Sequence, residues 1–256
     1  MSINAALVFG DTHVPFHDKR AWNIISSISK DLQPDCVVHI GDLLDCWQIS
    51  DFDKDPARRS TLQDDIDVAT GMLKTLQTQA PDAKYWLLEG NHEDRLRRLI
   101  WRMTDKQREL AHLRAFQEGI NWPALLGLNL ADDTGWTFVH AQGQARTRIL
   151  PKFITKHGQI IRKWSGASAK AEWERYGKSG LSGHTHRLGL FYTNDYNGSH
   201  VWAETGCTCL LQAEYVEDPC WQQGCAVITY VGDRFAVELV YIQNGVAVWR
   251  GKEYRG

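Results

Sequence analysis

The stretch "AALVFGDTH", residues 5–13, joins an apolar run directly to two side chains that bind metals in many proteins. An uncharged run of this kind, bounded by a turn signal, predicts a buried β-strand. Gly10 and Asp11 end the run, and His13 follows two residues later. Carboxylates and imidazoles are common metal ligands. The stretch therefore predicts a strand that delivers candidate metal ligands at its carboxyl end.

The same arrangement recurs through the first two-thirds of the chain. Four further segments predict strands: "CVVHI" (36–40), "KYWLLEG" (84–90), "WTFVH" (136–140) and "SGLSG" (179–183). The polar residues at their ends are Asp42 and Asp45, Asn91 and His92, His140, and His184 and His186. Alone, a Gly-Asp pair is a common turn and an Asn a common helix cap. Because the carboxyl ends of strands form the ligand crevice of α/β sheets, we expect all of them at one end of one sheet.

His184 and His186 stand at alternate positions in "SGHTHRL", residues 182–188. On an extended backbone, such positions share one face. We therefore expect both imidazoles to reach the same site, although a chance surface pair is the alternative for this stretch taken alone.

The spacing of apolar residues predicts a mixed α/β fold. A helical stripe runs from about Ser60 to Gln79, and strand-helix alternation indicates βαβ units with parallel strands. Beyond residue 188 the chain is β-rich, with Asn-Gly and Gly-Asp turns typical of hairpins. No linker-like segment appears, so we expect a single domain over residues 1–256 whose last third, about 188–256, is an antiparallel meander.

The composition excludes some classes of function. The chain has 256 residues, a formal net charge of −2 and a mean hydropathy of −0.40. No apolar run approaches the roughly 20 residues of a membrane span, and the first residues do not resemble a secretory signal. We expect a cytoplasmic protein with no membrane partner, in which the six cysteines are reduced thiols.

The inventory of strand-end residues indicates which metals would bind. Seven candidate ligands are too many for one catalytic ion that keeps an open position, but they suit two ions with a bridging carboxylate. Imidazoles, carboxylates and an amide oxygen without thiolates favour Mn²⁺, with Fe, Zn²⁺ or Ni²⁺ as alternatives. The paired histidines would then serve two different metals.

The motifs together resemble those of the calcineurin-like metallophosphoesterases. The family pattern is D-x-H, GD-x2-D, GNH-[DE], a later His and GH-x-H, and the motifs span residues 11–186 of this chain. The layout is similar to that of the stand-alone phosphoesterases of phages and prophages. The resemblance implies a two-sheet α/β/β/α sandwich, with the β-rich last third forming part of the second sheet.

The resemblance also implies a role for each matching residue. Asp11, His13, Asp42 and His186 would bind the first metal, and Asp42 would bridge to a second metal completed by Asn91, His140 and His184. A hydroxide bridging the two metals would be the nucleophile. His92 would protonate the leaving group or stabilise its charge, and Asp45 would orient His92 and favour its protonated form.

Departures from the family pattern bear on the substrate. Cys46-Trp47 stand where Ser/Thr phosphatases and dinucleoside-tetraphosphate hydrolases of the family carry Arg-Gly. Nucleases of the family that carry a capping domain typically have His at the position of Asp45. Small phosphodiesterases of the family do carry Asp there.

A basic segment lies between two of the motifs. Residues 143–178 hold nine Lys or Arg and two Glu, a local charge of 9 − 2 = +7, with Trp164 and Trp173 among them. A cationic rim with stacking surfaces suits nucleic acid or nucleotides, although a solvated helical face is the alternative. Arg95, Arg97 and Arg98 form a second candidate phosphate clamp.

These observations favour a phosphodiesterase that acts on nucleic acid, DNA or RNA, or on nucleotides. The alternatives are a phosphomonoesterase for a small metabolite or a nucleotide end, and a non-catalytic scaffold. A scaffold of this family would have lost ligands or the catalytic histidine, and this chain lacks none of them.

Overall fold

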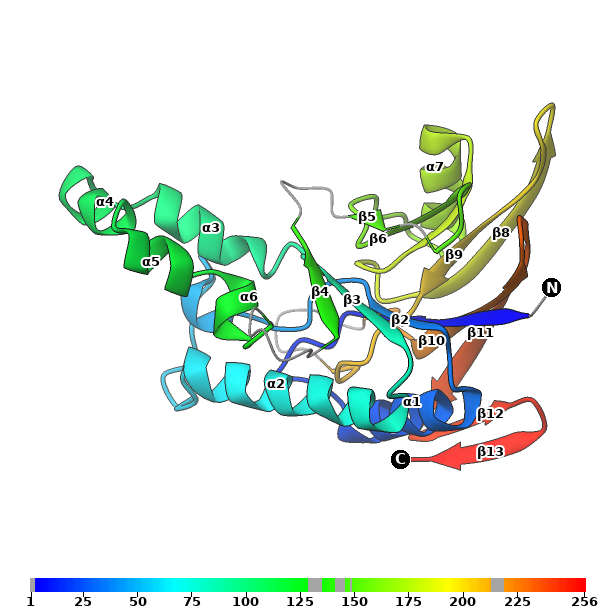
Figure 1. Ribbon diagram of the computed structural model, residues 1–256, viewed down its shortest axis with the longest axis horizontal. Coiled ribbons are helices and arrows are strands. Elements are labelled where there is room, and N and C mark those ends of the chain that lie inside the picture. Colours follow the sequence, from blue (N-terminus) through cyan, green and yellow to red (C-terminus); the bar gives the residue numbers. More distant parts are fainter. Residues whose placement is uncertain (1–2, 129–134, 141–145, 148, 213–218) are drawn as a thin grey trace.

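Two β-sheets packed face to face form the centre of the molecule, as Figure 1 shows for the computed structural model. The structure describes residues 3–128, 135–140, 146–147, 149–212 and 219–256. Within these residues the first sheet has the order β13 (Lys252–Arg255), β12 (Val246–Trp249), β11 (Arg234–Gln243), β10 (Gln223–Val231), β1 (Asn4–Phe9), β2 (Cys36–His39), β3 (Lys84–Leu88) and β4 (Trp136–Val139). The second has the order β5 (Arg146–Thr147), β6 (Phe153–Lys156), β7 (Ser179–Ser182), β9 (Gly198–Thr205) and β8 (Leu188–Asp195).

Helices cover the outer faces of both sheets. The described helices are α1 (Lys19–Leu32), α2 (Leu62–Gln79), α3 (Asp94–Trp101), α4 (Asp105–Ala111), α5 (Arg114–Gly119), α6 (Trp122–Leu125) and α7 (Ala167–Tyr176), with a 3₁₀ turn, η1 (Trp47–Ile49). Helices α1 and α2 pack on the first sheet and α7 on the second, whereas α3 to α5 project away from the sandwich (Figure 1). The predicted α/β/β/α sandwich is confirmed.

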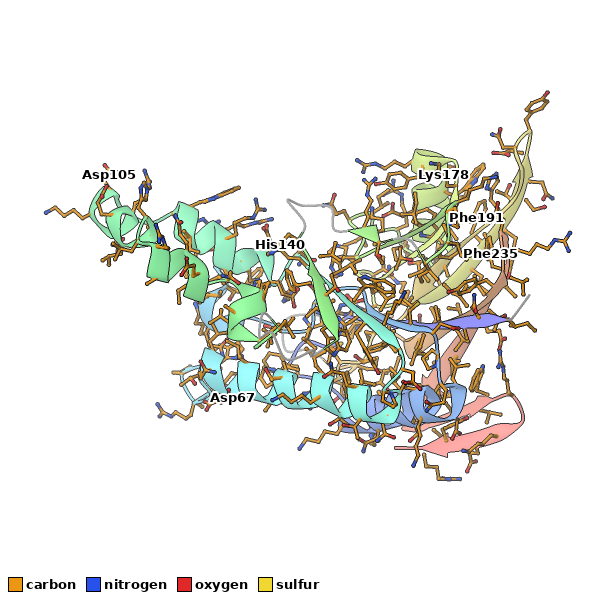
Figure 2. The ribbon with its side chains drawn as sticks, viewed as in Figure 1. Asp67, Asp105, His140, Lys178, Phe191 and Phe235 are labelled. Atoms are coloured by element: carbon orange, nitrogen blue, oxygen red, sulfur yellow. The ribbon has the colours of Figure 1, made fainter. Side chains whose placement is uncertain are left out.

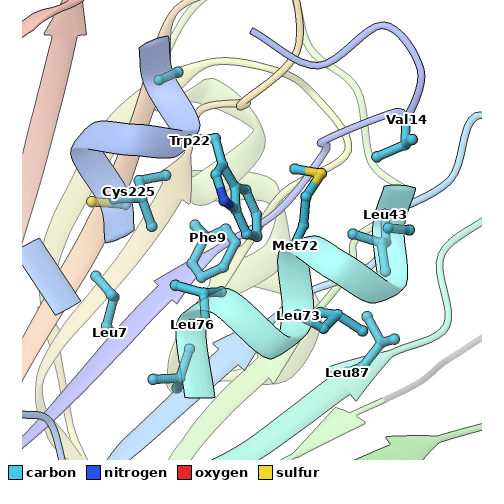
Figure 3. Packing of buried hydrophobic residues seen from close by; sticks show 14 of the residues in the cluster. Leu7, Phe9, Val14, Trp22, Leu43, Met72, Leu73, Leu76, Leu87 and Cys225 are labelled. Atoms are coloured by element: carbon cyan, nitrogen blue, oxygen red, sulfur yellow. The ribbon is translucent and has the colours of Figure 1, made fainter. Parts of the chain in front are cut away.

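Strand β1 shows why the opening stretch reads as a continuous apolar run. Leu7 and Phe9 point to the layer of α1 and α2, whereas Ala6 and Val8 point to the layer between the sheets. Because alternate residues of a strand face opposite sides, a strand buried on both faces needs apolar residues throughout. Figure 3 shows Phe9 packed beside Trp22 of α1.

Helix α2 matches the predicted helix over residues 60–79 closely. Thr61 caps its first turn in a reciprocal capping box with Asp64. Leu73 and Leu76 of the predicted stripe are buried, and Figure 3 shows Leu73 beside Leu87 of β3. No helix among the described residues is both long and apolar enough to span a membrane.

The last third of the chain divides between the two sheets. We had expected it to form part of the second sheet, and only some of its strands do so. Strands β8 and β9 belong to the second sheet. Strands β10 to β13 form the expected antiparallel meander but extend the first sheet, because β10 pairs antiparallel with β1. Hairpin signals predict that neighbouring strands pair, and only tertiary structure decides which sheet they join.

Candidate metal centre

The turns that follow five strands meet at one end of the sandwich. Strands β1, β2 and β3 are parallel neighbours in the first sheet, and β6 and β7 are parallel neighbours in the second. The expectation of a single sheet was therefore wrong, since the GHTH motif follows β7. Packing the two sheets face to face brings their carboxyl ends together.

Strained backbone marks the residues that point into the centre. Asp11, His13, Asp42, His184 and His186 all have positive φ, between 51° and 66°. A left-handed conformation costs a non-glycine residue about 1–2 kcal/mol, and such strain concentrates at functional sites. His184 and His186 therefore lie in a turn and not on extended backbone, and the sequence prediction on this point was wrong.

The first cluster joins Asp11, His13 and His186, all of them buried. His13 Nε2 lies 3.1 Å from His186 Nε2, which in turn lies 3.4 Å from Asp11 Oδ1. The carboxylate of Asp11 also accepts hydrogen bonds from the backbone N–H of His184. These bonds link the GHTH turn to the residues that follow β1.

The second cluster joins Asp42, His157 and His184. His157 Nε2 lies 3.2 Å from Asp42 Oδ2 and 3.3 Å from His184 Nδ1. The side-chain oxygen of Asn91 lies 2.9 Å from the same His157 nitrogen, so the amide completes the group.

Asp42 lies between the two clusters. Its Oδ2 atom is 3.2 Å from His157 Nε2 and 3.8 Å from His13 Nε2, while its Oδ1 accepts the backbone N–H of His92. Burial opposes its charge, but the surrounding imidazoles, His157 first, outweigh that effect and hold its pKa well below the usual range. One carboxylate therefore faces ligand atoms of both clusters.

His140 is the one predicted ligand that the structure does not bring to this centre. It follows β4 at the edge of the first sheet and is exposed, with its ring 4.8 Å from that of Phe138 (Figure 2). His157 stands in the cluster instead. A His-Gly pair after the short segment "FITK", residues 153–156, was the available signal, since β6 runs parallel to β7 and both end beside the site.

The imidazoles are oriented so that bare nitrogen atoms converge. His157 Nδ1 donates to the carbonyl oxygen of Ile40 over 3.1 Å, and His13 Nδ1 donates to Asp45 Oδ2 over 3.2 Å. A carbonyl or carboxylate partner on one nitrogen fixes the tautomer and leaves the other free for a metal. When these imidazoles are neutral, both Nε2 atoms present lone pairs to the cluster.

The donor set fits divalent cations. His157 Nε2 and His184 Nδ1 lie 3.3 Å apart, so a cation that displaces any proton between them could accept a lone pair from each. Burial disfavours charge on His157, yet Asp42 raises its pKa to about 9, so the site attracts positive charge. Imidazole, carboxylate and amide oxygen suit Mn²⁺, Fe and Zn²⁺.

His92 forms another candidate group with His13 and Asp42 and is also held by its own partners. Its Nδ1 donates to the backbone carbonyl of Asp45 over 2.8 Å and lies 3.4 Å from the Asp45 carboxylate. Arg95 donates to the same carbonyl, and its Nη2 lies 3.3 Å from His92 Nε2. Burial opposes charge on His92, but Asp42 and Asp45 outweigh it and raise its pKa.

Glu93, the last residue of the GNHE motif, anchors the loops that carry the ligands. Its buried carboxylate accepts the backbone N–H groups of Asp42 (3.0 Å), Leu44 (2.9 Å) and Gly90 (2.8 Å). Burial and the nearby Asp42 charge raise its pKa to about 7. A Cβ at Gly90 would collide with the Asp42 carboxylate, which explains the glycine in this motif.

Only some of the cations in the basic segment, residues 143–178, can form a cationic rim. Lys156 is buried, and its Nζ lies 3.0 Å from both carboxylate oxygens of Glu172, so this lysine is structural. Arg146, Lys152 and Lys178 line a cavity of about 340 Å³ at the edge formed by β5 and β6. Arg148 lies outside the described residues.

The second candidate clamp divides in the same way. Arg97 and Arg98 pair with Asp94 on their own helix, which leaves Arg95 as the arginine of this group that contacts the centre.

Sequence comparisons found similar proteins. The family model described as calcineurin-like phosphoesterase matches residues 6–188. The Gene 54 protein of Mycobacterium phage D29 is 28% identical over 253 residues, which cover 93% of this chain and 94% of the relative. The Gene 54 protein of Mycobacterium phage L5 is 27% identical over 252 residues, with the same coverage of each chain.

Two solved structures are also similar. Vacuolar Protein Sorting 29 from Cryptosporidium parvum aligns with a TM-score of 0.49 and 12% identity over 99% of each chain. Yfce, a phosphoesterase from E. coli, aligns with a TM-score of 0.37 and 10% identity over 91% of this chain and 98% of its own.

Proposed function

Since the chain belongs to the calcineurin-like phosphoesterase family, we propose that it is a dinuclear-metal-dependent phosphodiesterase acting on nucleic acid or nucleotides. The observation that carries the proposal is the position of Asp42, whose Oδ2 faces ligand nitrogens of both clusters. A carboxylate shared in this way is what a two-metal centre requires.

Each cluster would hold one ion. Asp11, His13, His186 and Asp42 would bind the first, and Asp42, Asn91, His157 and His184 would bind the second; His157 takes the place that the sequence interpretation gave to His140. When bound, the two ions would supply Lewis acidity to the phosphate and lower the pKa of a water molecule between them.

The remaining residues position substrate and protons. His92 would donate a proton to the leaving oxygen, since it borders the clusters without joining the second and its Nδ1 is held by Asp45. Asp45 would also orient His13, through the 3.2 Å contact of their side chains. Arg95 would hold His92 and Asp45 together from the start of α3.

A diester substrate is favoured by the cations on the segment that carries His157. Arg146 pairs with Lys156 between β5 and β6, and Lys156 directly precedes His157. The cavity that Arg146 lines also holds Lys152 and Lys178. Several separated cations suit a substrate with more than one phosphate.

The test compares p-nitrophenyl diesters and monoesters with Mn²⁺, Fe²⁺, Zn²⁺ or Ni²⁺, for the wild-type protein and Asp42→Asn. We expect metal-dependent diester hydrolysis that Asp42→Asn abolishes. Hydrolysis of the monoester alone would support the phosphomonoesterase alternative. A folded wild-type protein that hydrolyses neither ester with any of these metals would overturn the proposal and leave a non-catalytic scaffold.

A further inference from the structure

An exposed tryptophan lies on a loop that starts at one candidate metal ligand and is fixed to the turn of two others. Trp164 belongs to the segment 159–166, which follows His157 and precedes α7. Its side chain is 67% exposed, although Trp is a residue that normally gains much from burial. An exposed aromatic next to a candidate metal centre calls for a functional explanation.

Two buried or half-buried side chains clamp this loop to the GHTH turn. The carboxylate of Glu204 accepts the hydroxyl of Thr185 with one oxygen (2.7 Å) and the backbone N–H of Gly166 with the other (2.6 Å). Gln222 contacts Ser165 Oγ and the backbone N–H of Leu188 through its side-chain oxygen. The loop and the turn are therefore fixed relative to each other.

A third connection comes from the residue directly after His186. Arg187 donates from Nη1 to the carbonyl oxygen of Arg162, over 2.5 Å. This bond joins the loop backbone at Arg162 to the side chain of the residue that directly follows the metal-ligand turn. Trp164 is two residues farther along this anchored segment.

The surroundings of Trp164 are cationic. Lys163 Nζ lies 4.8 Å from the centroid of the Trp164 ring, and Arg162 and Arg187 are adjacent to the loop. The sequence from 157 to 171 contains no Asp or Glu. Trp221, next to Gln222, packs its ring 4.3 Å from that of His186, so a second aromatic side chain lies against the centre.

We propose that Trp164 is a stacking platform for a nucleobase of the substrate, next to the phosphate at the metal centre. The inference rests on the proposed function and names the residue that would contact a base of its substrate. Base–aromatic stacking tolerates any base because every base has a π-face, and nearby cations add attraction for the phosphate backbone. A pre-fixed platform avoids the entropy cost of ordering a mobile side chain on binding.

The experiment compares an eight-residue oligothymidylate with an abasic oligomer of the same sugar–phosphate backbone. Hydrolysis is measured with Mn²⁺, and binding is measured separately by fluorescence anisotropy with Ca²⁺ in place of Mn²⁺. The variants are Trp164→Ala and Trp164→Phe. The matched control is Trp101→Ala, because Trp101 is 64% exposed and also has a cation, Arg97, over its ring, but lies at the end of α3.

We expect Trp164→Ala to weaken binding of the oligothymidylate by roughly 5- to 140-fold, which is the range that one stacked base contributes. Binding of the abasic oligomer should stay unchanged, Trp164→Phe should keep most of the preference for bases, and Trp101→Ala should match the wild type. An equal preference for bases in Trp164→Ala and wild type would overturn the inference, as would an equal loss in Trp101→Ala. If wild type hydrolyses neither oligomer, the proposed function fails on that substrate, while the anisotropy result still decides the role of Trp164.

Discussion

Replacing Glu93 should test how the ligand loops are held, because this carboxylate is 1% exposed or less and accepts three backbone N–H groups. Glu93→Ala leaves all three donors buried and unpaired. Each unsatisfied buried donor costs about 1–3 kcal/mol, so three cost about 3–9 kcal/mol. That loss is comparable with the roughly 5–15 kcal/mol by which whole domains are stable, and we expect Glu93→Ala to fold poorly.

Glu93→Gln is the informative variant because it should fold. Its amide keeps one acceptor oxygen, but its NH₂ group must face at least one of the N–H groups of Asp42, Leu44 or Gly90. At pH 8, above the Glu93 pKa of about 7, one bond to a charged acceptor is lost, at about 1.5–3 kcal/mol.

Urea unfolding followed by circular dichroism measures this cost. The control is Glu109→Gln on the exposed surface of α4, which should stay within about 0.5 kcal/mol of the wild type. A Glu93→Gln midpoint equal to that of the control, with an unchanged m-value, would refute the reasoning.

Three further predictions address the ligands, the acid and the fold. His157→Ala should weaken binding of one of the two Mn²⁺ ions, measured by calorimetry, by more than the roughly 10–100-fold that is lost when a residue behind a ligand is changed. His140→Ala should leave the binding of both ions unchanged. The reverse pattern would contradict the geometry. His92→Ala should slow diester hydrolysis by about 10²–10⁴-fold with metal content unchanged by elemental analysis, and an emptied site would show that it is a ligand. Burial opposes the charge of Asp18, the cap of α1, but hydrogen bonds from Arg20 and Gln223 outweigh burial and lower the pKa of Asp18 to about 2. The ionised carboxylate therefore stabilises the folded state above pH 3.9, which is about its pKa in the unfolded chain, and this stabilisation is lost as the pH falls toward 2. Asp18→Asn should keep the cap but unfold in urea with a weaker dependence on pH between 4 and 2, whereas an unchanged dependence would contradict the assignment.

Much of the centre could be predicted because local sequence determines it. Asp11 follows an apolar strand that is buried on both faces, and the period-2 burial of Leu7 and Val8 explains why the run is continuous. Strand ends and the carboxyl edge of a sheet are local and topological rules, so the residues they deliver can be named from the sequence.

His157 could not be found in the same way. The strand before it has four residues and includes Lys156, which reads as exposed. Lys156 is buried only because Glu172 of α7 lies 3.0 Å from its Nζ, and this pairing across the fold is absent from the local pattern. The more hydrophobic segment before His140 drew the assignment, yet its strand lies at the edge of the first sheet.

The sheet assignment of the last third shows the same limit. Hairpin turns after β10 and β11 predict the meander. The pairing of Ala6 with Ile228, more than two hundred residues apart, decides that the meander extends the first sheet. No local signal encodes a contact of that separation.

The most direct test of the central claim is a digest of 5′-labelled single- and double-stranded DNA with Mn²⁺, in which wild type and Asp42→Asn run side by side. We expect cleavage by the wild type alone, since Asp42 faces both clusters, and the ladder would show the polarity of cleavage. Equal cleavage by both proteins would contradict a centre built on Asp42, and no cleavage of DNA or of the model diesters by a metal-loaded wild type would contradict the phosphodiesterase itself.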